Sequence, residues 1–289
     1  MKRAAFDLYE PEKPRCGLVL SSPHSGREYP AEFIAQSPLS ARALRSSEDA
    51  FVDLLFQDAP GLGVPLLTAR APRAYVDLNR GADELDPALI EGVKRTGLNP
   101  RLSSGLGVIP RVVAGGRVIH PGRISRAEAD ERLSRHWHPW HKKLSEVMAA
   151  QRSRFGQVLL LDCHSMPHDA VSHLRSCDGE PPEIVLGDRH GAACAPQVMS
   201  KIEGAFRTAG FRTSRNIPFA GAWITQTWGR PQAGCHAIQV EIDRSLYMDE
   251  ASLTPRPEFD RIRARLAMAV GTVVQILRQG DAPRALAAE

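Results

Sequence analysis

Two short runs of apolar residues, each followed by polar side chains and a histidine, dominate the hydrophobic pattern of this chain. Residues 158–161 read Val-Leu-Leu-Leu and lead into Asp-Cys-His-Ser, which contains His164. Residues 17–20 lead in the same way, through two serines and a proline, to His24. Such runs are typical of strands buried on both faces. Because open α/β sheets place ligand sites at the carboxyl ends of their strands, we expect both imidazoles at one edge of one sheet.

The remaining pattern alternates predicted helices with predicted strands, which is typical of the α/β class. Helical spacing of apolar residues predicts helices at 38–57, 128–154, 196–209 and 258–279, the second interrupted at Pro139. Further strands are expected at 64–69, 73–78, 184–186, 211–217 and 236–242. Two stretches rich in turn-forming residues, 81–110 and 168–182, predict long loops of the kind that border active sites.

Length and composition fit one α/β domain over residues 1–289, with an extended arm at 1–15 and a flexible tail at 281–289. The net charge of +4 is spread along the chain, so it gives no nucleic-acid signal, although it could favour an anionic substrate. We expect no membrane segment, because no window approaches 18 uncharged apolar residues. Five cysteines without CxxC spacing predict reduced thiols in a cytoplasmic protein.

Neutral imidazoles and carboxylates are the usual ligands of catalytic zinc, and His24 and His164 fit two of them. A single histidine after a strand is more often a hydrogen-bonding loop residue, so this hypothesis rests on the pair in matching contexts. The residues alone do not choose a third ligand. The candidates are Glu28, Glu48, Asp49 and Asp53, of which Asp49 and Asp53 share a helical face that could equally be a solvated surface.

Three further polar residues lie at the ends of predicted strands. Glu241 suits a general base beside a zinc-bound water, although a strand-end carboxylate paired with Arg244 explains its position equally well. Asn79 and Arg80 suit a carboxylate-bearing substrate, because a guanidinium binds a carboxylate through two hydrogen bonds. An Arg at a strand end is otherwise ordinary.

A histidine-rich segment, Arg-His-Trp-His-Pro-Trp-His at 135–141, offers a second histidine pair. His138 and His141 have i, i+3 spacing, which could indicate a metal pair. The proline and two tryptophans between and beside them favour a packed helix junction instead. Neither a GxSxG elbow, a Walker loop nor a GxGxxG motif after a strand is present. Cys163 faces away from the neighbouring His164 on a strand, which makes a cysteine hydrolase a weak hypothesis.

Several short motifs occur in an order that resembles the N-formylglutamate amidohydrolase family across nearly the whole chain. They are PHSG at 23–26, SEDAFVD at 47–53, VDLNR at 76–80, DCHSM at 162–166 and HAIQVEIDRSLYMDE at 236–250. The segment 221–231 is similar to the family's Gly-Thr-Gly-Pro loop, and HPWH at 138–141 resembles its W-x-P-Y-H segment. The resemblance implies a three-layer αβα fold with a mixed, mostly parallel sheet, like that of the zinc exopeptidases and phosphorylase/hydrolase-like proteins.

The resemblance also implies roles for individual residues. His24, Asp49 and His164 would hold Zn²⁺, with Glu241 as catalytic base and Arg80 stabilising the oxyanion. The relatives carry an acidic ligand three residues after the first histidine, where this chain has Arg27, so the ligand is assigned to Asp49. Substrate contacts would come from Asn79, Arg80, Gly221, Thr225 and Arg175, with Arg123 and Arg215 as weaker candidates.

The implied reaction is hydrolysis of N-formyl-L-glutamate to formate and L-glutamate, a late step of histidine breakdown. Zinc would lower the pKa of its bound water, and Glu241 would take the water's proton and pass it to the departing amine. Two alternatives stay open. One is a zinc amidohydrolase or carboxypeptidase-like peptidase that acts on another N-acyl amino acid or small peptide, and the other is a non-catalytic binding protein that retains the fold. The acyl preference and the oligomeric state are not readable from the sequence.

Overall fold

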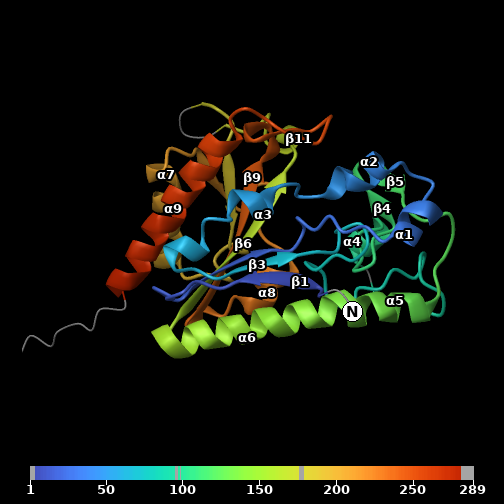
Figure 1. Cartoon of the computed structure of the whole chain (residues 1–289), viewed down its shortest axis with the longest axis horizontal. Coiled ribbons are helices and arrows are strands. Elements are labelled where there is room, and N and C mark those ends of the chain that lie inside the picture. The colour runs from blue at the N-terminus through green and yellow to red at the C-terminus, as the bar shows by residue number, and fades with distance from the viewer. Residues whose placement is uncertain (1–3, 95–96, 98, 176–178, 281–289) are drawn as a thin grey trace, which may run out of the picture.

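The computed structural model describes residues 4–94, 97, 99–175 and 179–280, and its centre is a seven-stranded sheet (Figure 1). The strands of this sheet are β1 (Phe6–Tyr9), β2 (Leu18–Ser22), β3 (Leu66–Ala69), β6 (Val158–Met166), β7 (Ile184–Gly187), β8 (Thr213–Arg215) and β9 (Cys235–Asp243). Their order is β1-β3-β2-β6-β9-β7-β8. Only the β1–β3 and β7–β9 pairs are antiparallel. The mixed, mostly parallel sheet expected from the sequence is therefore confirmed.

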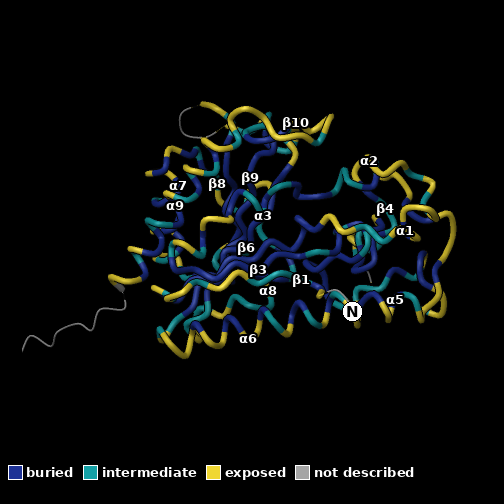
Figure 2. Tube along the Cα trace, viewed as in Figure 1, coloured by how far each residue is buried: buried dark blue, intermediate teal, exposed yellow. Residues whose placement is uncertain are grey.

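Helices cover both faces of the sheet. The longer helices are α6 (His138–Phe155), α7 (Pro196–Thr208) and α9 (Phe259–Gly280), and the shorter ones here are α3 (Val52–Leu55) and α8 (Trp223–Trp228). One apolar core packs α3, α7 and α9 against one face, and a second packs α6 and α8 against the other. Figure 2 shows the central strands of the sheet, such as β6, as the most buried part of the fold, whereas the outer faces of the helices are exposed. This is the three-layer αβα arrangement.

A smaller group of elements extends beyond the end of the sheet, and we call it the lobe (Figure 1). It contains α1 (Ala31–Gln36), α2 (Ala41–Leu44), α4 (Pro100–Ser103), α5 (Arg126–Arg132), β4 (Val112–Val113) and β5 (Arg117–Val118). The lobe has a small apolar core of its own that includes Phe33, Leu44 and Ile119. A short hairpin of β10 (Met248–Asp249) and β11 (Thr254–Pro255) lies elsewhere, after β9.

Two predicted elements were wrong. The helix expected at 38–57 is broken, because Phe51 has a left-handed backbone (φ 66°) that separates α3 from α2 and its following 3₁₀ turn. The strand expected at 73–78 is a turn and coil segment: the N–H groups of Tyr75 and Val76 both donate to the carbonyl of Pro72. Its alternating apolar residues are buried against the helices and the lobe core instead of in a sheet ladder.

The other predicted elements match the structure within a few residues. Helix 128–154 is present as α5 and α6, joined by a π-helical turn at Leu133–Trp137 just before Pro139. The extended arm at 1–15 contributes the edge strand β1, and the predicted tail at 281–289 lies outside the described residues. No helix in the described part of the chain is long and apolar enough to cross a bilayer.

Candidate active site

The two histidines that follow the apolar runs meet at one end of the sheet. His164 lies within β6, and His24 follows the end of β2 by two residues. These strands are parallel neighbours, with Ser21 opposite Asp162. The imidazole ring centroids are 4.7 Å apart, and both side chains are buried. The sequence prediction that both imidazoles share one edge is confirmed.

Asp49 is the acidic residue that joins them. Its Oδ2 atom lies 3.4 Å from His24 Nδ1 and 3.0 Å from His164 Nδ1. The backbone N–H of Asp49 also donates to the carbonyl of His24, which fixes the segment between α2 and α3 against the β2 loop. The three other acidic candidates face elsewhere: Glu48 pairs with Arg45, Asp53 with Arg27, and Glu28 with Arg70.

Each imidazole is oriented by a second carboxylate. His24 Nε2 lies 2.7 Å from Asp77 Oδ1, and His164 Nε2 lies 2.8 Å from Asp162 Oδ2. A carboxylate at Nε2 holds the proton on that nitrogen, which leaves the Nδ1 lone pair pointing toward Asp49. The Nδ1 atom of His24 is buried without a hydrogen-bond partner among the described residues. Two nitrogen lone pairs and a carboxylate oxygen thus converge on one point.

The sequence interpretation missed both orienting carboxylates. Asp162 precedes His164 by two residues, so both side chains lie on the same face of β6. The two-residue period of a strand could have predicted this. Asp77 lies two residues before Asn79, in a segment that was expected to be a strand but is not one. No local pattern indicates that such a segment brings a carboxylate to His24.

Arg244 and Ser165 hold the other oxygen of Asp49. The Oδ1 atom accepts hydrogen bonds from Arg244 Nη2 at 3.0 Å and from the Ser165 hydroxyl at 3.1 Å. Arg244 Nε also donates to the Ser165 oxygen at 3.0 Å. The sequence alternative that Arg244 pairs with Glu241 is therefore wrong, because this guanidinium binds Asp49 instead.

The electrostatics of these groups favour a positive charge between them. Burial alone would lower the pKa of His164, but the carboxylates of Asp162, Asp49 and Glu241 together raise it well above its ordinary value. For Asp49 the signs are reversed: burial alone would raise its pKa, but the hydrogen bonds and charges of the two imidazoles bring it well below the usual range. Within the described residues, His24, Asp49 and His164 are the one group whose ligand atoms, all within 4.8 Å of one another, could hold a metal ion.

This donor set fits a divalent metal. Two imidazole nitrogens and one carboxylate oxygen are the ligands that catalytic zinc uses when it keeps a fourth position open. The unpartnered Nδ1 of His24 and the carboxylates behind both rings are the features expected of such ligands before a cation binds.

Glu241 lies beside this group. It is on β9, directly opposite His164 in the parallel β6–β9 register, and it is buried. Burial, reinforced by Asp49 and opposed by His164, raises the pKa of Glu241 to about 7. Gln239 Nε2 donates to Glu241 Oε1 at 2.6 Å, which fixes the orientation of the carboxyl group. A buried carboxylate with a pKa near neutrality has the properties of a general base.

Asn79 and Arg80 follow Asp77 along the chain. The side-chain oxygen Oδ1 of Asn79 accepts from the Ile224 N–H at 2.8 Å, and the side-chain Nδ2 donates to Gln239 Oε1 at 3.3 Å. Its hydrogen-bonding groups are therefore occupied by the protein. The Arg80 guanidinium donates to the backbone carbonyls of Leu106 and of Asn79, both at 3.0 Å, and has no carboxylate within ion-pair distance in the described residues.

A cavity of about 810 Å³ opens onto these groups, between the end of the sheet and the lobe. Gly221 lines it with a backbone φ of 106°, and a Cβ there would lie 2.5 Å from the Thr225 hydroxyl. Thr225 itself is fully buried beneath this loop and bonds the Ala222 carbonyl. Thr225 therefore does not line the cavity, where a substrate contact was predicted, and instead supports the loop that carries Gly221.

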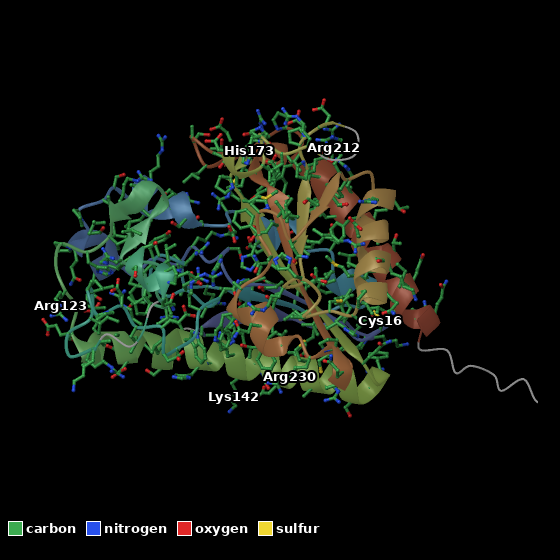
Figure 3. The ribbon with its side chains drawn as sticks, turned by 180° about the vertical axis from the view of Figure 1, so that it is seen from behind. Cys16, Arg123, Lys142, His173, Arg212 and Arg230 are labelled. Carbon is green, nitrogen blue, oxygen red and sulfur yellow. The ribbon has the colours of Figure 1, made fainter. Side chains whose placement is uncertain are left out.

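Three arginines proposed from the sequence lie outside the cavity wall. Arg175 donates to the backbone carbonyls of Ser172 and Leu174, and Arg215 pairs with Glu203. Figure 3 shows Arg123 at the outer edge of the lobe, where it donates to backbone carbonyls. Loop position alone suggested these residues, and it does not determine where a side chain points.

The histidine-rich segment at 135–141 packs against the backbone of residues 78–80, which lead into the cavity wall. His141 Nε2 donates to the carbonyl of Leu78 at 2.9 Å, and Trp137 Nε1 donates to that of Arg80 at 2.8 Å. Both rings also contact Trp223. The packed helix junction predicted from the sequence is confirmed, and the described part of the chain does not bring His138 and His141 into a metal-ligand group.

Comparison with known proteins gives a consistent result. The chain matches the family model for N-formylglutamate amidohydrolase over residues 16–248. It is 32% identical to the N-formylglutamate deformylase of Pseudomonas aeruginosa over 243 residues, which cover 83% of this chain and 85% of that protein. The corresponding enzyme of Pseudomonas putida is 31% identical over 238 residues, with 82% and 83% covered.

Solved structures agree with these sequence relatives. The crystal structure of N-formylglutamate amidohydrolase from Ralstonia eutropha JMP134 superimposes with a TM-score of 0.88 at 34% identity, covering 96% of this chain and 100% of that one. A gene product from Agrobacterium tumefaciens shares the fold with a TM-score of 0.66 at 18% identity, over 95% and 96% of the two chains. The ordered motifs, the fold and the relatives together show that the chain belongs to the N-formylglutamate amidohydrolase family.

Proposed function

We propose that this protein is a metal-dependent amidohydrolase that cleaves N-formyl-L-glutamate to formate and L-glutamate. The observation that carries the proposal is the convergence of His24, Asp49 and His164 on one point, with Glu241 beside them at the wall of the cavity. Family membership and the names of the relatives support the substrate.

His24 Nδ1, His164 Nδ1 and Asp49 Oδ2 would hold the metal, which we propose to be zinc because of the mixed nitrogen and oxygen donors. A bound zinc ion acidifies a water molecule and polarises the formyl oxygen. Asp77 and Asp162 would keep the two imidazoles in the tautomer that ligation requires.

Glu241 would move the proton. It takes a proton from water as the water oxygen forms a bond to the formyl carbon, and it delivers that proton to the amide nitrogen as the C–N bond breaks. Since Gln239 occupies Oε1, the Oε2 atom is the one left for this transfer. The base must be ionised, so activity should fall as the pH drops through the pKa of Glu241, which is about 7 without the metal's charge.

Arg80 would bind a carboxylate of the substrate. Its guanidinium lines the cavity and is positioned by two backbone carbonyls. The backbone of the Gly221 loop would form another part of the cavity wall, while Asn79, already bonded to Ile224 and Gln239, would hold Arg80 and the base in place. We also propose a cytoplasmic setting, because described cysteines such as Cys163 and Cys194 are free thiols.

The experiment is a formate-release assay on purified protein with N-formyl-L-glutamate, before and after chelation and after zinc is added back. We expect release to be lost on chelation and restored by zinc. Release that persists after complete removal of metal would refute the metal-dependent mechanism. N-acetyl-glutamate and N-formyl amino acids with neutral side chains, run in parallel, would identify a related amidohydrolase with another substrate. A metal-binding protein that cleaves none of them would be the non-catalytic alternative.

A further inference from the structure

Among the described residues, four guanidinium groups line the cavity, and two of them form ion pairs with carboxylates of the protein. Arg73 Nε lies 3.1 Å from Asp77 Oδ2, and Arg244 Nη2 lies 3.0 Å from Asp49 Oδ1. Both pairs belong to the metal-ligand network already described. These two positive charges are therefore already balanced by carboxylates of the protein.

The other two, Arg80 and Arg101, have no carboxylate within ion-pair distance among the residues that the structure describes. The Arg80 guanidinium is buried, and within the described part of the chain it donates to backbone carbonyls alone. Arg101 is an exposed residue of α4, and its guanidinium makes no hydrogen bond to another described residue. Both side chains nevertheless line the same cavity.

One short segment of backbone contacts both of these arginines. Leu106 accepts the hydrogen bond from Arg80 Nε at 3.0 Å, and its own N–H donates to the carbonyl of Arg101 at 2.8 Å. The N-cap of α4 adds to this, because the Asn99 side chain accepts from the Arg101 N–H at 3.0 Å. The Arg80 guanidinium and the backbone of Arg101 thus contact the same short segment, and both side chains line the one cavity.

Arg80 and Arg101 repel each other, and neither has an ion-pair partner among the described residues. Burial lowers the pKa of Arg80; of the charges that act on it, Asp77 attracts most strongly, Arg73 and then Arg101 repel, and Glu84 attracts more weakly. A ligand with two negative charges removes this repulsion and gains a charge-assisted hydrogen bond at each end. The wall therefore suits a dicarboxylate better than a monocarboxylate.

We propose that Arg101 is a specificity-determining residue, which binds the side-chain carboxylate of an N-formyl acidic amino acid while Arg80 binds its α-carboxylate. The inference rests on the proposed function. Asn79, the neighbour of Arg80, contacts His164 at 3.3 Å, so Arg80 is on the metal side of the cavity. The α-carboxylate is attached next to the reacting amide and belongs there. The side-chain carboxylate, two methylenes farther out, reaches the lobe.

The test is a cycle of two substrates and two enzymes. N-formyl-L-glutamine replaces the side-chain carboxylate of N-formyl-L-glutamate by a neutral group of the same size. For the wild type we expect kcat/KM to favour the glutamate substrate by at least about ten-fold, as one charged hydrogen-bonding contact predicts. Arg101→Gln should lower kcat/KM for the glutamate substrate by a similar factor, and leave the glutamine substrate within about two-fold of the wild type.

Three further variants make the result specific. Arg80→Gln should lower kcat/KM for both substrates, because both retain the α-carboxylate. Arg126→Gln is the matched control, since this exposed arginine pairs with Asp130 on α5 and does not line the cavity. Arg101→Lys, which keeps the charge but not the two-pronged geometry, should retain part of the preference.

Different results overturn different claims. If Arg101→Gln keeps the wild-type preference for glutamate over glutamine, Arg101 does not bind the side-chain carboxylate, although deformylation itself would stand. A similar loss on both substrates would also contradict the proposal, because it would assign Arg101 a general role. If the wild-type enzyme releases formate from neither substrate, the proposed function falls and this inference falls with it.

Discussion

Glu241 combines burial, a fixed orientation and a raised pKa at the wall of the cavity, and these properties make a direct prediction. Glu241→Gln keeps the size and the contact with Gln239 but cannot accept a proton. We expect kcat to fall by about two to four orders of magnitude, while zinc content per protein molecule is unchanged. Glu146→Gln, an exposed carboxyl on α6, is the control. A Glu241→Gln enzyme near wild-type rate would show that another group is the base.

Arg244 offers a second test at the residue scale, because it acts on Asp49 and not on the reacting atoms. Its Nη2 and Nε atoms donate to Asp49 Oδ1 and to the Ser165 hydroxyl, which leaves Oδ2 of Asp49 facing the histidines. A lysine cannot make both bonds. We expect Arg244→Lys to weaken zinc binding by about ten- to hundred-fold, measured by competition with a chelating dye in the absence of substrate.

The outcome of that titration separates two roles for Arg244. Unchanged zinc affinity together with a raised KM would make it a substrate-binding residue, since it also lines the cavity. Arg256→Lys provides the comparison, because this exposed arginine donates to the carbonyl of Ser245 and does not line the cavity.

The sequence predicted some site residues and not others for a physical reason. His24 and His164 follow apolar runs, and a run that ends at a sheet edge determines where the next residues lie. Arg244 reaches the site from a 3₁₀ turn after β9, and Asp77 from a turn and coil segment that the sequence predicted as a strand, so the predicted elements did not determine where these side chains point. Among the four acidic candidates, Asp49 was chosen by resemblance, and the geometry agrees with that choice. The roles of these residues in catalysis stay predictions.

At the scale of elements, the broken helix is the most informative error. A regular helix over 38–57 would continue past Asp49, but the chain turns there, with Asp49 bonded to the His24 carbonyl and Phe51 in a left-handed conformation. Local apolar spacing favoured the helix, and contacts with the β2 loop outweigh it. Departures from local preference are expected at functional sites, and this one places an acid beside two imidazoles.

The loop that carries Gly221 gives a prediction about an element. Gly187, at the end of β7, packs so closely against this loop that a Cβ would lie 2.6 Å from the backbone carbonyl carbon of Ala220. Gly187→Ala should therefore displace the cavity wall, lower kcat/KM and destabilise the protein by about 1–3 kcal/mol. Formate release and urea unfolding measure the two effects.

A second glycine is the matched control for that change. Gly204 lies in the interior of α7 with nothing within 4 Å of a Cβ. Gly204→Ala should stabilise the protein by about 0.5–1 kcal/mol and leave the rate unchanged, because alanine favours the helix. Equal effects of the two substitutions would show that the β7 contact does not shape the wall.

For the molecule as a whole, the sheet and the lobe differ in how far the sequence determines them. Apolar runs predicted nearly every strand of the central sheet, and helical spacing of apolar residues predicted the longer helices on its faces. The lobe contains short elements and a small apolar core, and residues 81–110, which contribute to it, show no sustained period. The cavity lies between these two parts, so one wall of it could be anticipated from the strand ends and the other could not.

The last prediction concerns the stability of the whole fold against acid. His141 is buried behind the site, and burial lowers its pKa from 6.5 to about 3. Between these two values the unfolded chain binds a proton at this position and the folded chain does not. The free energy of unfolding therefore falls as pH decreases from 6.5 toward 3, by up to about 1.4 kcal/mol per pH unit from this residue.

His141→Gln isolates that contribution, because glutamine can still donate to the Leu78 carbonyl but does not titrate. We expect the variant to lose less stability than the wild type between pH 6.5 and 4.5, measured by urea unfolding at each pH after metal removal. Comparing two proteins at the same pH cancels the other groups, including Glu241, whose raised pKa acts in the opposite direction over this range. If wild type and variant lose stability equally over this range, His141 is protonated to the same extent in the folded and the unfolded chain. Burial behind the site would then not lower its pKa.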